Sequence, residues 1–152
     1  MNKIQRQIEI KNRRASFEYI FREKFIAGIV LMGSEIKSIR LGKVALSDSY
    51  CVIQNGEVWI RNLQIQEYEK AKHYGHEPIR DRKLLLTSHE ISKLEKKLKD
   101  QGLTLIPLCL FTSEKGWAKL EIALAKGKKT VDKREDIRSR DIAREIGRKL
   151  KK

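Results

Sequence analysis

The sequence predicts a mainly β fold with flanking helices, a small antiparallel barrel that is followed by a disordered basic tail. Three observations support this expectation. Strand-like runs rich in β-branched and aromatic residues recur between residues 17 and 125, short turn signals separate them, and the strand pattern ends near residue 126. The chain of 152 residues suits one domain with a tail. We expect a basic arm at 1–14, a barrel domain at 15–126 and a tail at 127–152.

The first elements are a long strand and a short helix. Residues 17–30 are rich in aromatic and β-branched side chains and are predicted to hold the first strand. Residues 33–42 follow as a short helix with apolar residues on one side. Ser34 is a suitable N-cap, and Gly42 can take the left-handed conformation that ends a helix.

A hairpin and a long polar loop come next. The Asn-Gly pair at 55–56 lies between two β-rich runs within 49–63, and it supplies the positive φ angles that a type I′ turn needs. The loop at 66–82 is long for a compact domain, and loops of this length are often functional. It contains His73 and His76, which we interpret as solvated histidines because no further metal ligands lie nearby in the sequence.

A strand and a capped helix follow the loop. The run Arg-Lys-Leu-Leu-Leu at 82–86 predicts a strand, and residues 88–101 predict a helix. Thr87 and Glu90 have the spacing of a capping box. The buried side of this helix is expected to carry Ile91, Leu94 and Leu98.

The last predicted element is a second hairpin, over residues 103–112 and 117–125. Pro107 should lie at an edge or a bulge, because proline has no N–H to give to a neighbouring strand. One core face and one wet face are expected, because Leu120, Ile122 and Leu124 alternate with Lys119, Glu121 and Ala123. Several antiparallel strands with two helices are typical of a small barrel, and an OB-like barrel that binds irregular RNA is one solution.

The charge is concentrated at the two ends of the chain. Of the net charge of +14, residues 1–14 carry +4 and residues 126–152 carry +7. Two basic ends on a nearly balanced domain favour a polyanionic partner. RNA or DNA is preferred to a membrane, because residues 132–152 lack the large apolar face of a membrane-surface helix. The tail has only a narrow apolar stripe, Ile142, Ile146 and Leu150, which suggests that it becomes helical on binding.

The sequence contains no recognisable catalytic machinery. It lacks a Walker motif and a G-x-G-x-x-G motif, and no Ser/His/Asp grouping has sequence support, so we expect no enzyme activity and no cofactor. Because His73 and His76 lack further ligands nearby, we also expect no metal. Cys51 and Cys109 lie in apolar runs and are expected to be buried, inert thiols. The N-terminus has no signal-peptide pattern, and no run is apolar enough to span a membrane, so we expect a cytoplasmic protein with no membrane partner.

An ordered series of motifs resembles the bacterial SsrA-binding protein family, also called small protein B (SmpB). The match runs from about residue 10 to the C-terminus. The first motifs are Asn12-Arg13-Arg14-Ala15, Ala27-Gly28-Ile29, Gly33-Ser34-Glu35-Ile36-Lys37-Ser38-Ile39-Arg40, Ser47-Asp48-Ser49-Tyr50 and Asn55-Gly56-Glu57. The later motifs are Pro78-Ile79-Arg80, Arg82-Lys83-Leu84-Leu85-Leu86, Ala125-Lys126-Gly127-Lys128-Lys129 and Asp132-Lys133-Arg134-Glu135-Asp136-Ile137.

The resemblance implies an OB-like barrel that binds transfer-messenger RNA at its tRNA-like domain. It further implies delivery of this RNA to stalled ribosomes for trans-translation, with the tail entering the empty small-subunit decoding centre and the mRNA channel. We expect a monomer. A ribosomal protein or ribosome-assembly factor is the alternative that the composition leaves open.

The resemblance also assigns residues to two sites. The RNA-binding site is expected to contain Asn12, Arg13, Arg14, Glu35, Lys37, Arg40, Lys83, Leu85, Lys126 and Lys128. The decoding-centre tail is expected to contain Lys128, Lys129, Asp132, Lys133, Arg134, Asp136 and Arg138. Two of these residues have structural alternatives. Glu35 could pair with Lys37, Arg40 or a backbone amide instead of RNA, and Leu85 could belong to the core.

The sequence departs from the family pattern at two positions. Ile26 stands where the family commonly has a glutamate on the RNA-facing surface, which bears on one RNA contact. Val131 stands where the family usually has histidine or tyrosine, so it cannot supply an aromatic stack.

Overall fold

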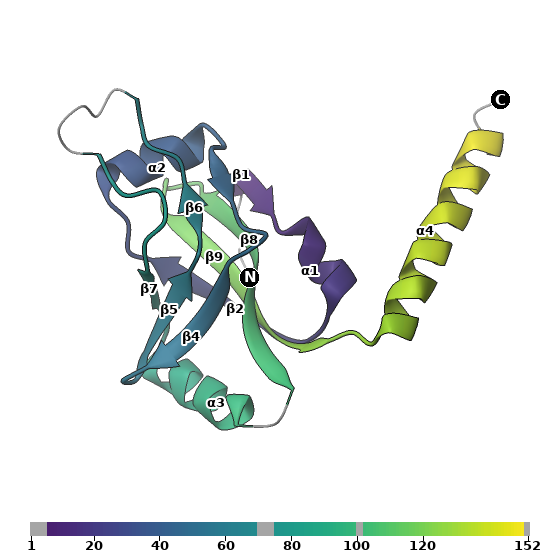
Figure 1. Ribbon diagram of the computed structural model, residues 1–152. Helices are drawn as coiled ribbons and strands as arrows, with labels where there is room; N and C mark the ends of the chain where they lie inside the picture. Colours follow the sequence, from purple (N-terminus) through teal and green to yellow (C-terminus); the bar gives the residue numbers. More distant parts are fainter. Residues whose placement is uncertain (1–5, 70–74, 100–101, 151–152) are drawn as a thin grey trace.

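The computed structural model describes residues 6–69, 75–99 and 102–150. Four helices and nine strands make up this part of the chain (Figure 1). In order, they are β1 Arg6–Lys11, α1 Arg13–Glu18, β2 Tyr19–Ile29, α2 Gly33–Arg40, β3 Val44–Ala45, β4 Tyr50–Gln54, β5 Glu57–Arg61, β6 Gln64–Ile65, β7 Arg82–Leu85, α3 Ser88–Leu98, β8 Leu103–Ser113, β9 Ala118–Gly127 and α4 Thr130–Leu150.

The main sheet closes on itself. Its strand order is β1-β8-β4-β5-β7-β2-β9, all neighbours are antiparallel, and β8 also pairs with β9. The additional pairing closes the strands from β8 to β9 into a ring around the core. Helices α2 and α3 lie at opposite ends of this ring, and α4 projects away from it (Figure 1). The predicted fold class, mainly β with flanking helices, is confirmed.

Strand β8 makes the ring possible because it changes partner at a bulge. One of its edges pairs with β4 at Leu105 and with β1 from Cys109 onward, while the other edge follows β9. The register with β9 shifts between Pro107 and Cys109, at the proline that cannot donate to the ladder. The predicted bulge at Pro107 is therefore confirmed.

The predicted turn and cap signals are confirmed. Asn55 and Gly56 have φ angles of 53° and 73°, as a type I′ turn requires between β4 and β5. The Thr87 side chain accepts from the Glu90 N–H at 3.2 Å, and the Thr87 N–H donates to the Glu90 carboxylate at 3.0 Å. Helix α3 then packs Leu94 into the core, with no exposed surface.

Two predictions about the strands are wrong. The strand within residues 17–30 is the second, because β1 precedes it and lies along β8. The outward face of β9 is not uniformly wet, since Ala123 and Ala125 are fully buried. They form a second small core with Ala15, Ile106 and Leu108, because helix α1 covers this part of the barrel wall.

The start of helix α2 also differs from the prediction. Its N-cap is Met32, whose N–H donates to the Glu35 carboxylate at 2.8 Å. The Ser34 hydroxyl is instead 2.8 Å from Nδ1 of His76, and Nε2 of His76 lies 2.9 Å from the Ile65 carbonyl. His76 is thus buried between α2 and β6 and is not a solvated loop histidine. His73 lies outside the described residues.

A buried ion cluster holds α2 against β7. Glu35 and Arg82 are both fully buried and form an ion pair, and Arg80 binds the same carboxylate from a partly exposed position. Arg82 also donates to the carbonyls of Leu63 at 2.6 Å and Pro78 at 3.2 Å. A buried charge is tolerated when it is paired and its remaining hydrogen-bonding groups are satisfied, which is the situation of Arg82.

The surroundings of Glu35 favour its charged form. Burial by itself raises the pKa of this carboxyl, but hydrogen bonds from Arg80, the Met32 N–H and Arg82 outweigh burial and lower the pKa below its ordinary value. The carboxylate is therefore ionised wherever the protein is folded near neutral pH.

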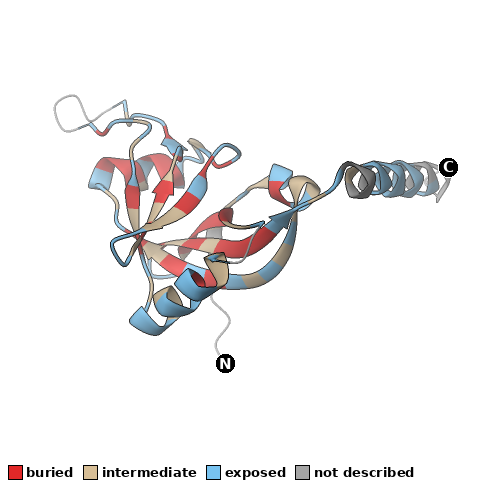
Figure 2. Ribbon diagram, turned by 60° about the horizontal axis from the view of Figure 1, so that its bottom comes forward, coloured by how far each residue is buried: buried red, intermediate tan, exposed pale blue. Residues whose placement is uncertain are grey.

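Helix α4 packs sparsely against the barrel. It meets the body at helix α1, where Lys133 and Arg140 lie 5.9 and 5.1 Å from the centre of the Phe17 ring. Ile137, Ile142 and Ile146 are about half exposed, and Figure 2 shows α4 extending away from the buried residues. A helix with so little packing gains little stability from the body. That the tail is disordered until it binds stays a prediction.

The cysteines are buried, as the sequence predicts. Cys51 and Cys109 are both buried thiols. Burial strongly raises the pKa of the Cys51 thiol, so the reactive thiolate is suppressed there.

We expect Glu35→Gln to destabilise the protein by about 3 to 5 kcal/mol, because it leaves Arg82 charged and buried without its partner. Urea unfolding monitored by circular dichroism measures the change. Glu57→Gln is the matched control, since Glu57 forms a partly exposed pair with Lys83. The control should lose less than about 1 kcal/mol. Equal losses in both variants would contradict a structural role specific to Glu35.

The stabilisation from Glu35 should depend on pH. Because its pKa is lowered in the folded state, its contribution is fully present above the ordinary glutamate pKa of about 4.3 and is lost as the pH falls through the lowered pKa. The difference in unfolding free energy between wild type and Glu35→Gln should therefore shrink below about pH 4. A difference that stays constant from neutral pH into the acid range below the lowered pKa would contradict this prediction.

Candidate nucleic-acid interface

The outer wall of the barrel carries the first group of predicted RNA-binding residues. Lys83 and Leu85 alternate with the buried Arg82 and Leu84 on β7, so they face outward. Leu85 is 53% exposed, so the alternative that it belongs to the core is wrong. Lys83 forms an ion pair with Glu57 on β5 at 3.2 Å, and exposed pairs of this kind contribute little to stability.

A row of residues continues from Leu85 across three strands. Gly28 of β2 lies opposite Leu85 on one side and opposite Lys119 of β9 on the other. A Cβ at Gly28 would lie 3.3 Å from the Leu85 Cβ, so glycine lets β7 and its side chain approach closely. Ile26 follows two residues away on the same face and is 42% exposed. The position that departs from the family pattern therefore adds a second exposed apolar side chain to the face that carries Leu85.

Helix α1 carries a second group. Arg13 and Arg14 are exposed, and Arg14 forms ion pairs with Glu18 and Asp48 at 3.4 and 3.5 Å. Asn12 is half-buried and has structural partners: its N–H donates to the Leu108 carbonyl at 2.8 Å and its Nδ2 to the Pro107 carbonyl at 2.9 Å. Asn12 thus attaches the start of α1 to the bulge in β8, and the two arginines are the residues of this motif that face solvent.

Of the predicted RNA-binding residues on helix α2, two are accessible and one is buried. Lys37 and Arg40 reach the surface, and the Lys37 ammonium lies 5.3 Å from the Tyr68 ring centre. Glu35 is fully buried and meets Arg80 and Arg82. The expectation that Glu35 faces RNA is corrected, because no part of its carboxylate reaches the surface.

The remaining cations lie where the barrel passes into the tail. Lys126 is exposed near the end of β9, and the Lys128 N–H donates to the Glu18 carbonyl at 2.8 Å. Among the described tail side chains, those expected to meet the ribosome are exposed or half-buried: Lys129, Lys133, Arg134 and Arg138. Asp132 and Asp136 belong to α4, and their side chains lie outside the described part of the chain.

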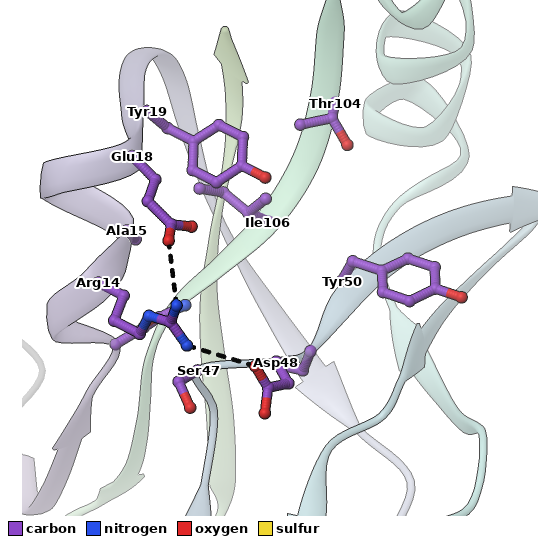
Figure 3. Close-up of a pocket in the computed structure, with 11 residues that line it drawn as sticks. Arg14, Ala15, Glu18, Tyr19, Ser47, Asp48, Tyr50, Thr104 and Ile106 are labelled. Carbon is purple, nitrogen blue, oxygen red and sulfur yellow. Dashed lines mark ion pairs between the residues drawn. The ribbon is translucent and has the colours of Figure 1, made fainter. Parts of the chain in front are cut away.

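A hollow of about 290 Å³, with a mixed polar and apolar lining, separates helix α1 from strands β4 and β8 (Figure 3). Arg14 and Glu18 approach it from α1, and Asp48 from the loop before β4. Tyr19 and Tyr50 stand on different sides of the hollow, and Thr104 and Ile106 of β8 line it. Sequence reasoning missed this site, because its residues come from three separate segments. One sequence feature pointed to this hollow. The Ser47–Tyr50 motif resembles the family pattern and has no obvious role in the core.

Two further surface residues were missed by sequence reasoning. Trp117 is 67% exposed at the turn between β8 and β9, and Lys119 extends the outer-wall row. The alternation of apolar and polar residues along β9 already indicated that Lys119 faces outward. An exposed tryptophan cannot be told from a core tryptophan by sequence alone.

The described residues support neither a metal site nor a membrane-spanning helix. Within them, no cluster of three or more His, Cys, Asp and Glu side chains is arranged to hold a metal ion. None of the helices in this part of the chain is both long enough and apolar enough to cross a membrane.

Comparison with known proteins connects these features to one family. The family described as SmpB protein matches residues 9–152. The SsrA-binding protein of Cytophaga hutchinsonii is 54% identical over 145 residues, which cover 95% of each chain. The SsrA-binding protein of Parabacteroides distasonis is 49% identical over 150 residues, which cover 99% of this chain and 98% of that one.

A solved structure shows the same likeness in three dimensions. It is described as "tmRNA-SmpB: a journey to the center of the bacterial ribosome" and is 42% identical to this chain. The match has a TM-score of 0.70 and covers 86% of this chain and 94% of the other. Sequence and structure agree over nearly the whole length, and the chain therefore belongs to the SmpB family of SsrA-binding proteins.

Proposed function

We infer that this protein binds transfer-messenger RNA and delivers it to stalled ribosomes for trans-translation. The observation that carries this function is the likeness over almost the full chain to SsrA-binding proteins and to a structure described as tmRNA-SmpB in the bacterial ribosome. The alternative, a ribosomal protein or ribosome-assembly factor, is not favoured, since the relatives are named for SsrA binding. The protein acts with ribosomes, which supports a cytoplasmic location.

The surface chemistry supports an RNA-binding body. Arg13 and Arg14 on α1, Lys37 and Arg40 on α2, and Lys83 on β7 are cations with exposed or half-exposed side chains. Cations of this kind neutralise phosphates and release counterions, which supplies much of the affinity for nucleic acid. We propose that the tRNA-like domain contacts these residues and Leu85, with Lys126 and Lys128 at the edge.

The tail supports a separate role on the ribosome. Residues 126–152 hold +7 of the net charge of +14, and the described isoleucines of α4 are about half exposed. A stalled ribosome without a codon offers a channel lined with phosphates. A cationic segment that orders only in that channel pays its ordering entropy there and so reports that the channel is empty.

The absence of catalysis is part of the proposal. The family is one of RNA-binding proteins. We propose that the protein acts by binding and positioning alone, without metal or cofactor.

Replacing Arg13 and Arg14 together by alanine should weaken binding of the tRNA-like domain and flatten its salt dependence. Each phosphate that the variant no longer neutralises should reduce the log–log slope by roughly 0.7 to 0.9. Filter binding or fluorescence anisotropy between roughly 50 and 200 mM salt, a range over which such slopes are resolved, measures both quantities. Lys96→Ala with Lys99→Ala is the control, because both lysines are exposed on or just after α3. An unchanged affinity and slope in the arginine variant would remove these residues from the site.

A chain truncated after Gly127 should keep its fold and most of its affinity for transfer-messenger RNA, because β9 ends at Gly127. It should fail to support peptide tagging on stalled ribosomes, since the tail is missing from the channel. Both quantities are measured on the same truncated protein, with the full chain as control. Losses of affinity and tagging in proportion would show that the tail is only a further RNA clamp.

A further inference from the structure

The hollow between α1, β4 and β8 has the composition of a nucleobase pocket. Its volume of about 290 Å³ leaves room for a flat base, and it combines aromatic rings with hydrogen-bonding groups (Figure 3). Tyr19 and Tyr50 provide ring faces and hydroxyls, while Ile106 provides an apolar floor. Stacking on aromatic side chains and polar contacts to the base edge are the means by which proteins hold unstacked RNA bases.

The charges around the hollow favour a neutral ligand that donates hydrogen bonds. Glu18 and Asp48 contribute two negative charges at its rim, and Arg14 contributes one positive charge. A phosphate entering the hollow would meet a surplus of negative charge. The protein as a whole is strongly basic, so an RNA chain can approach while its phosphates stay outside and a base enters.

Arg14 indicates which base would fit. Its Nη2 lies 3.4 Å from the Glu18 carboxylate and its Nη1 lies 3.5 Å from the Asp48 carboxylate. The two carboxylates thus flank a planar fork of N–H donors. Among the RNA bases, guanine is the one that presents two neighbouring donors, N1–H and N2–H₂, on its pairing edge. In the protein alone, the guanidinium of Arg14 supplies the donors that meet these two carboxylates.

The ion pairs of Arg14 are easily exchanged. The side chains of Arg14, Glu18 and Asp48 are 61%, 34% and 83% exposed, and both distances are long for hydrogen-bonded pairs. Exposed ion pairs of this kind contribute little to stability, so the arginine can leave without unfolding α1. Once displaced, it is free to bind the phosphate of the same nucleotide.

We propose that this pocket binds an unstacked guanine of the RNA partner, with Glu18 and Asp48 accepting from its N1–H and N2–H₂. Tyr19 and Tyr50 flank the base, and Arg14 moves from the two carboxylates to the adjacent phosphate. This site is separate from the outer wall around Lys83 and Leu85. The proposal rests on the proposed function, because it assumes an RNA partner with an accessible base.

The test uses uridine hexamers that carry one central guanosine or one central inosine, bound to the full chain. Inosine lacks the N2 amino group but has the same phosphates, so the comparison removes non-specific electrostatic binding. Fluorescence anisotropy should show the guanosine hexamer binding roughly fivefold or more tightly, because a hydrogen bond to a charged acceptor is missing with inosine. Amide NMR shifts should be centred on Tyr19, Tyr50 and Thr104.

Matched variants connect this preference to the pocket. Asp48→Asn should abolish most of the preference for guanosine, and Tyr50→Ala should weaken binding of both hexamers. Asp81→Asn is the control, because Asp81 pairs with Arg61 and does not line the hollow. This control should behave as wild type.

Three results would overturn the proposal: equal binding of the two hexamers, a preference that survives in Asp48→Asn, or pocket NMR shifts that arise with an arginine-rich peptide and not with the guanosine hexamer. The last result would assign the hollow to a protein partner. Binding of the tRNA-like domain by wild type is measured in parallel. Failure of that binding would refute the proposed function, whereas intact binding with no guanosine preference would refute only the guanine pocket.

Discussion

The buried pair of Glu35 and Arg82 is the interaction on which the geometry of the outer wall around Lys83 and Leu85 depends. Taking two charges out of water is costly, so the pair exists only where both partners and their remaining hydrogen bonds are in place. Arg82 meets Glu35 from α2 and carbonyls from the segments before and after β6. Strand β7 is therefore fixed in one register, with Arg82 and Leu84 inside. Since side chains alternate along a strand, Lys83 and Leu85 must face outward, and a slip of one residue would bury a lysine and expose Arg82.

Ion pairs of similar composition have different consequences in this protein because their exposure differs. Around Arg82, burial makes the pair an obligatory part of the fold. Around Arg14, the same kinds of side chains lie in water, so their ion pairs contribute little to stability. The core pair determines which side chains of β7 face outward, whereas the fold does not depend on the exposed pairs.

The structure also separates a closed barrel from a helix that extends away from it. The barrel closes through β8 and β9, and its inward side chains form one continuous core that includes Leu94 of α3. Helix α4 meets this body at α1, chiefly around the Phe17 ring. A closed barrel and a helix that extends away from it present two different surfaces to partners. This arrangement suits a protein that joins one RNA to a ribosome.

The sequence alone determined the features that depend on neighbouring residues. The Asn55-Gly56 turn, the Thr87 cap, the bulge at Pro107 and the basic tail follow from backbone preferences and charge, which act within a few residues. The motif series also identified the family. Only the tertiary structure decided which side chains share an environment. Glu35 does not take its expected place on the RNA face because Arg80 and Arg82, more than forty residues away, meet it in the interior. His76 is buried for a similar reason, since Ser34 and Ile65 converge on it. The hollow beside Arg14 combines three segments, and no local pattern encodes that meeting because it depends on the closure of the barrel.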